Sequence, residues 1–249
     1  KENKIIQLNI NKKLFLLGGK NFNNFFYYDH KLNTLFFASN TLYNHQYGVM
    51  VYCSTNNSIY LLGGNDQKNC EICCINNLNS LIWEDLPDLN EERREFSSIY
   101  YKDYIYVFFG LSIVNSSFIS SIERINVDKN DKFEIVYSNE NISLGSTGCC
   151  ILKEIYEDEQ NCEKEYIILL GGYDESDYLD KSYLFDLSDQ ELKECEITIP
   201  NLDKYKQFLF RREPAFIEFE PGYNYAFDWN NNVHLLSKES YELFIQDLN

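Results

Sequence analysis

A short apolar segment that ends in a glycine pair recurs along the chain, and this repetition restricts the fold more than any other feature. Its copies are Leu14–Gly19, Ile59–Gly64, Tyr104–Gly110, Tyr166–Gly172 and a degenerate Asn224–Trp229. Gly18 and Gly63 are 45 residues apart, and Phe109, which replaces the first glycine of the third copy, lies 46 residues further on. Periods of about 40–50 residues favour propeller blades over helical repeats.

Each copy is accompanied by three further strand-like runs, which gives four short strands per repeat. The runs before the glycine strands are Ile5–Asn9, Tyr47–Cys53, Phe96–Tyr101, Thr147–Leu152 and Pro214–Phe219. The runs after them are Phe25–Asp29, Thr34–Ala38, Glu71–Ile75, Leu81–Pro87, Ser121–Val127, Lys132–Tyr137, Ser182–Asp186, Glu194–Ile199, Val233–Ser237 and Tyr241–Gln246. The 20 Tyr and 18 Phe also favour strands. The acidic segment Glu154–Lys164 is predicted to be an extended loop.

The repeat resembles the kelch repeat, in which a glycine pair is followed by an aromatic residue and then by a tryptophan. The best match carries Gly63-Gly64, Cys74 at the usual tyrosine position, Trp83, Leu86-Pro87 and Arg93 or Arg94. In the other copies the tryptophan position is assigned to Phe36, Phe133, Leu192 and Phe244. The resemblance implies an all-β fold, a β-propeller of about five four-stranded kelch-like blades in a single domain spanning residues 1–249.

The approximate blades are residues 1–40, 41–90, 91–138, 139–200 and 201–249. Kelch-like rings more usually have about six or seven blades. Whether the ring closes with five blades or a sixth lies outside this chain is therefore left open.

The chain is acidic, with 22 Lys and Arg against 39 Asp and Glu and a formal net charge of −17. This charge disfavours nucleic acid and anionic membranes as partners, and it would steer a basic partner toward the chain. No apolar stretch reaches the ~20 residues of a transmembrane helix, so no membrane insertion is predicted. The 8 Cys are scattered rather than arranged as a disulfide framework, which favours reduced thiols and a cytoplasmic location.

Few residues could carry out catalysis or bind a metal. The 3 His, at positions 30, 45 and 234, form no pair at metal-ligand spacing. Cys70 and Cys73 form a C-x-x-C, but its only candidate partner pair is Cys149-Cys150, whose adjacent side chains point to opposite faces of a strand. Buried strand thiols are the favoured interpretation. The acidic segment Asp174–Asp180 lacks the glycine and terminal glutamate of an EF-hand. No cofactor is predicted.

The binding hypothesis rests on loops, because kelch-like propellers usually meet ligands through the loops after the glycine strands and between blades. Two arginine pairs, Arg93-Arg94 and Arg211-Arg212, fall in matching blade-to-blade loops. Arginine binds carboxylates bidentately, so these four are predicted to form a rim site for an acidic segment. The alternative is that they pair with neighbouring glutamates or have a structural role in the repeat. Further candidate binding residues in the loops are Phe22, Asn65, Asp66 and Tyr173.

The sequence therefore predicts a protein–protein interaction module, a scaffold or adaptor, rather than an enzyme. Its partner would be another protein, bound through an acidic segment or a basic surface. One alternative is an enzyme on the same fold, such as an oxidase, lyase or hydrolase. Another is a structural subunit of a larger, for example cytoskeletal, assembly.

Overall fold

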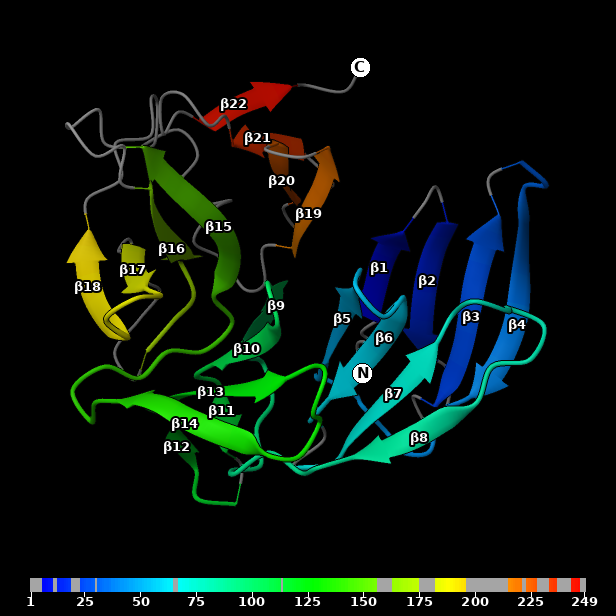
Figure 1. The fold of residues 1–249 in the computed structure, drawn as a ribbon, viewed down its shortest axis with the longest axis horizontal. Helices are drawn as coiled ribbons and strands as arrows, with labels where there is room; N and C mark the ends of the chain where they lie inside the picture. Colours follow the sequence, from blue (N-terminus) through cyan, green and yellow to red (C-terminus); the bar gives the residue numbers. More distant parts are fainter. Residues whose placement is uncertain are drawn as a thin grey trace. The chain divides into compact units, whose positions relative to one another are not determined.

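The computed structural model describes residues 6–10, 13–18, 23–29, 31–64, 67–112, 114–155, 163–174, 182–195, 215–220, 223–227, 233–236 and 243–246. Every regular element in these ranges is a β-strand, which confirms the all-β prediction (Figure 1). None of these residues belongs to a helix that could span a membrane. The chain forms two compact units, residues 1–138 and 139–249.

Residues 1–138 contain three four-stranded antiparallel sheets. The first joins β1 (Ile6–Ile10), β2 (Lys13–Gly18), β3 (Asn24–Asp29) and β4 (Thr34–Asn40). The second joins β5 (Val49–Cys53), β6 (Ser58–Leu62), β7 (Cys70–Cys74) and β8 (Trp83–Leu86). The third joins β9 (Ser97–Tyr101), β10 (Tyr104–Phe108), β13 (Ser121–Asn126) and β14 (Phe133–Ser138). Between β10 and β13 the chain forms a small separate hairpin of β11 (Leu111–Ser112) and β12 (Ser117–Phe118). β1 lies beside β5 and β5 beside β9, so the first strands of successive sheets are neighbours.

Residues 139–249 contain two more four-stranded antiparallel sheets. One joins β15 (Gly148–Ile155), β16 (Glu163–Leu170), β17 (Ser182–Asp186) and β18 (Glu191–Cys195), and the other joins β19 (Ala215–Glu220), β20 (Tyr223–Phe227), β21 (Val233–Leu236) and β22 (Leu243–Gln246). β15 and β19, the first strands of these sheets, are again neighbours. Each of the five four-stranded sheets falls within one of the five predicted blade intervals.

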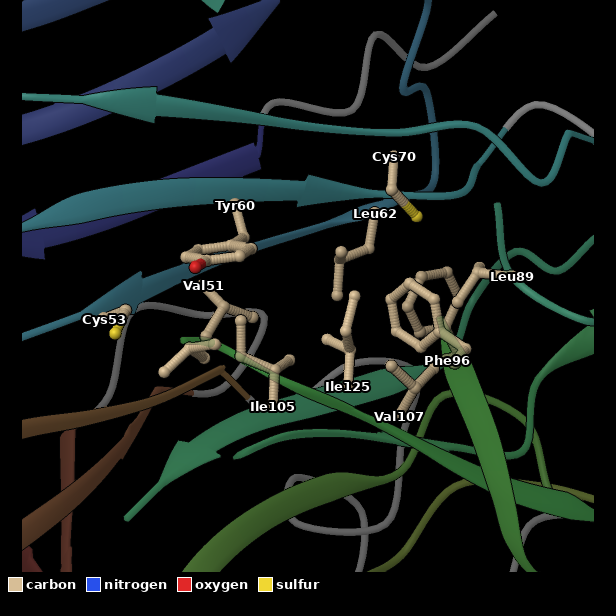
Figure 2. Close-up of a cluster of buried hydrophobic side chains, with 12 residues drawn as sticks. Val51, Cys53, Tyr60, Leu62, Cys70, Leu89, Phe96, Ile105, Val107 and Ile125 are labelled. Carbon is tan, nitrogen blue, oxygen red and sulfur yellow. The ribbon is translucent and has the colours of Figure 1, made fainter. Parts of the chain in front are cut away.

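The core of residues 1–138 lies between the sheets. One face of the second sheet carries Ile59, Leu61, Cys73 and Trp83, which pack with Phe15, Leu17 and Phe25 of the first sheet. Its other face carries Val51, Tyr60, Leu62 and Cys70, which pack with Ile105, Val107, Ile125 and Phe133 of the third sheet (Figure 2). Because side chains alternate along a strand, each sheet can contribute to two cores at once.

The glycine pairs have a backbone role that the structure makes explicit. The first position has a φ of 50° at Gly63 and 54° at Phe109, a left-handed conformation that an L-residue can adopt at some cost. The second position has a φ of 110° at Gly110, where a Cβ would lie 2.8 Å from the Arg94 carbonyl oxygen. In this repeat the second position therefore excludes a side chain, whereas the first position accommodates Phe109.

Some predicted boundaries need correction. The fourth strand of the fourth sheet, β18 (Glu191–Cys195), begins three residues before the predicted run Glu194–Ile199, because it follows a tight turn at 187–190 directly. Positions 196–199 of that run lie outside the described residues. The predicted loop Glu154–Lys164 is shorter, since β15 extends to Ile155 and β16 begins at Glu163. The strand register identifies the residue of each fourth strand that is equivalent to Trp83. In the third and fourth sheets it is Phe133 and Leu192, as predicted. In the first and fifth sheets it is Leu35 and Leu243 instead of the predicted Phe36 and Phe244.

Candidate functional site

The connections at one end of the three sheets in residues 1–138 are joined to one another. We call their described residues, 41–48, 67–69, 87–96, 109–112 and 114–120, the loop end. Glu95 N donates to Tyr47 O at 3.0 Å, and Leu89 N donates to Lys68 O at 2.9 Å. Arg94 and Leu111 exchange two backbone hydrogen bonds, of 3.0 and 2.9 Å. Consecutive inter-sheet loops and the β11–β12 hairpin thus form one connected surface.

Arg93 lies in the interior of this region and is fully buried. Its guanidinium makes an ion pair with the buried Glu123 of β13, and its Nη1 donates to Phe109 O at 2.9 Å. Burial lowers the pKa of Arg93, and the charge of Glu123 opposes that shift. Arg93 therefore anchors the inter-sheet loop to the third strand of its sheet. This replaces the rim-site interpretation of Arg93 with the structural alternative, because the guanidinium is enclosed and its charge is already compensated.

His45 occupies the same position one repeat earlier. It lies four residues before β5 begins, as Arg93 does before β9, and it too is fully buried. Its Nε2 is 2.7 Å from Glu71 Oε1, and its Nδ1 is 2.7 Å from Gly63 O. Since a carbonyl oxygen can only accept, Nδ1 carries a hydrogen. Glu71 faces Leu61 across the strands, as Glu123 faces Val107, so His45–Glu71 and Arg93–Glu123 are equivalent anchor pairs.

The carboxylate of each anchor pair also holds the loop backbone. Leu42 N donates to Glu71 Oε2 at 2.8 Å, and Asn90 N donates to Glu123 Oε2 at 2.9 Å. In the fourth sheet the equivalent positions are occupied by Leu144 and Tyr183, both buried. The chain thus fills one structural position either with a buried basic side chain paired with a glutamate or with a leucine and a tyrosine.

Arg94 has a different environment from its neighbour. Its side chain is 28% exposed and its guanidinium lies over the Tyr47 ring, with 5.7 Å between the guanidinium carbon and the ring centroid. Glu95 Oε1 is 4.0 Å from Arg94 Nε, which is too far for a hydrogen bond. Within the described part of the chain, Nε of Arg94 is buried and has no hydrogen-bond partner. Of the two residues in this doublet, only Arg94 faces outward.

The other predicted binding residues are distributed as follows. Tyr173 is half-buried and exchanges two backbone hydrogen bonds with Gly145, the same arrangement that joins Leu111 to Arg94. The remaining five lie outside the described residues: Phe22, Asn65, Asp66, Arg211 and Arg212. By its place in the sequence, Arg211 precedes β19 by four residues, as Arg93 precedes β9.

The C-x-x-C segment lies in β7, and its two thiols belong to different cores. Cys70 packs between the second and third sheets and Cys73 between the first and second. Burial raises the pKa of each thiol to about 12. Cys53, Cys70, Cys73, Cys74, Cys149 and Cys195 are free thiols. Among the residues with described positions, no group of three or more His, Cys, Asp or Glu could hold a metal ion.

The sequence reasoning missed the anchor pairs. Glu71 was available as a signal, because it is the one charged residue of β7, and a carboxylate in an apolar strand is almost never buried unless it is paired. Glu123 gave a weaker signal, since Arg124 follows it and β13 also contains Ser121 and Asn126. No protein-family model matches the sequence, and a search of curated proteins found no match either.

Proposed function

We propose that the protein is a kelch-like β-propeller that binds a partner protein through its loop end, as a scaffold or adaptor. The observation that carries this proposal is the connected loop surface of residues 1–138, built by equivalent anchor pairs in successive repeats. The fixed loops would present outward groups such as Arg94 and the β11–β12 hairpin in a defined arrangement. Rigid presentation reduces the entropy that a loop surface loses on binding.

The order of the sheets supports the propeller. Within each unit, the first strand of one sheet lies beside the first strand of the next, as expected for blades arranged around an axis. The left-handed residue two positions before each first strand also repeats, at Tyr47, Glu95 and Ser146. Equivalent backbone conformations at equivalent positions are typical of repeated blades.

The outer face of the first sheet also supports a propeller. Leu35 and Phe37 of β4 are 51% and 58% exposed, and Phe37 packs edgewise on Phe26, its cross-strand partner. Trp83 and Phe133, which occupy the register position of Leu35 in the second and third sheets, are buried, with 6% and 5% exposure. A closed ring supplies a neighbouring sheet for every such face. A propeller would therefore remove an apolar surface that is otherwise costly to leave in water.

The described free thiols, including the buried Cys70 and Cys73, support a reducing compartment such as the cytoplasm.

The test compares two exposed aliphatic residues, one at the loop end and one on an outer strand. Val114, at the tip of the β11–β12 hairpin, is 73% exposed, and Ile135 of β14 is 53% exposed. Proximity labelling and affinity purification from the native source would define the wild-type partners. We expect Val114→Asp to lose a partner that Ile135→Asp retains, with both variants keeping the wild-type melting temperature. Retention of every partner by Val114→Asp, or equal losses in both variants, would contradict binding through the loop end.

A further inference from the structure

Arg94 is the one described arginine at the loop end whose charge is not engaged by a close acceptor. Arg93 is enclosed with Glu123. Arg94 instead has its guanidinium over the Tyr47 ring, and Glu95 Oε1 lies 4.0 Å from its Nε. This Nε is buried without an acceptor among the described residues, so a ligand from solvent would reach the guanidinium through its Nη groups. Stacking on Tyr47 also fixes the plane of the fork before a ligand arrives.

An apolar side chain lies beside this fork. Leu111 is directly opposite Arg94 in the backbone ladder, so the two side chains project from the same side of the ladder. Leu111 is partly exposed, and it begins the hairpin whose tip carries Val114. The surroundings of Arg94 thus combine a cation, an aromatic ring and an aliphatic surface.

The charge distribution permits an anionic ligand at this place despite the acidity of the whole chain. Residues 1–138 contain 13 Lys and Arg against 15 Asp and Glu, a net charge of −2. Residues 139–249 contain 9 against 24, a net charge of −15. The unit that holds Arg94 is therefore nearly neutral, and the excess negative charge of the chain lies in residues 139–249.

We propose that Arg94, stacked on Tyr47 and flanked by Leu111, is a carboxylate-binding site for an acidic side chain of a partner peptide that carries an adjacent aliphatic residue. This inference rests on the proposed function, because it names the chemistry recognised at the same loop end. The carboxylate accepts from the two Nη groups of Arg94, an end-on bidentate geometry that lysine cannot reproduce. The aliphatic residue lies on Leu111.

The experiment is a titration followed by NMR through the arginine Nε–Hε signals of the full chain. The probe is acetyl-Leu-Glu-amide, and the control probe is acetyl-Leu-Gln-amide, which has the same shape without the charge. We expect the Arg94 signal to move saturably with the glutamate probe, with at least about tenfold weaker binding of the glutamine probe. Arg124 is a matched internal control, since its Nε is also buried without a partner and its guanidinium stacks on Tyr104 at 4.2 Å.

Two variants complete the test. Arg94→Lys should lose most of the preference for glutamate and Arg94→Gln all of it, while the backbone amide spectrum of the rest of the chain is unchanged. Equal binding of the two probes to the wild-type protein, or equal movement of the Arg94 and Arg124 signals, would overturn the proposal. If the Arg94 signal ignores the glutamate probe while Val114→Asp still loses a partner, the carboxylate site is refuted and the loop-end function stands. If the probe binds but no partner depends on the loop end, the carboxylate site stands and the proposed function fails.

Discussion

Replacing Glu123 by glutamine would leave the guanidinium of Arg93 inside the protein without its counter-charge. Both side chains are fully buried, and Glu123 Oε2 also accepts from Asn90 N at 2.9 Å and from Asn90 Nδ2 at 2.7 Å. Removing one partner of a buried ion pair costs about 3–5 kcal/mol, because the other charge stays desolvated. At about 2–4 °C per kcal/mol for a chain of this size, the melting temperature should fall by roughly 6–20 °C.

The chain itself supplies the control for this prediction. Leu144 and Tyr183 occupy the equivalent positions of the fourth repeat, so Arg93→Leu combined with Glu123→Tyr copies an uncharged pair that the chain already uses. We expect the double variant to lose less stability than Glu123→Gln alone, about 1–3 kcal/mol for the unpaired Asn90 groups. Glu134→Gln, which affects a half-exposed carboxylate 3.6 Å from Arg124, should cost less than about 1 kcal/mol. Thermal melts and urea titrations followed by circular dichroism measure all three. A Glu123→Gln variant as stable as Glu134→Gln would refute the anchor-pair interpretation.

Two further predictions concern the sheet cores. Trp83→Ala should destabilise the protein by roughly 3–5 kcal/mol in a urea titration. Trp83 is buried, its ring packs edgewise on Phe25 with 5.1 Å between ring centroids, and its Nε1 donates to Ser39 Oγ at 3.0 Å. A loss below about 1 kcal/mol would contradict its core position. A thiol reagent at neutral pH should label the exposed Cys74 and spare Cys70 and Cys73 until the chain unfolds, as mass mapping would show. Burial raises the pKa of Cys70 and Cys73 from 9.0 to about 12 in the folded protein. Their contribution to stability is therefore complete below about pH 9 and is lost as pH rises toward 12. A free energy of unfolding that stays constant over that pH range would contradict their burial.

The strand pattern was predictable because it depends on local features. The glycine pair at 63–64 has positive φ at both positions, and the strands before it, β5 and β6, are short apolar runs of the kind that is buried on both faces. The failure at β18 shows the limit of that reasoning. The apolar residues Cys195, Ile197 and Ile199 favoured a strand at Glu194–Ile199. The turn at 187–190 instead allows the strand to begin earlier, in the mainly polar Glu191–Cys195.

The site was harder to predict, because the roles of two adjacent arginines depend on which way each side chain points. Successive side chains in an extended segment point to opposite sides, so the Arg93-Arg94 doublet divides into one buried and one half-exposed residue. Sequence alone does not show that Glu123, 30 positions along the chain, lies under Arg93. The pairing depends on the third strand of the sheet, and so it becomes visible only in the folded structure.

The most direct test of the propeller is an experimental structure of the full chain, read for the placement of the five sheets. We expect all five to share one axis, with β1, β5, β9, β15 and β19 innermost and Leu35 covered by a neighbouring sheet. Two units packed without a common axis, or Leu35 left in solvent, would contradict the propeller.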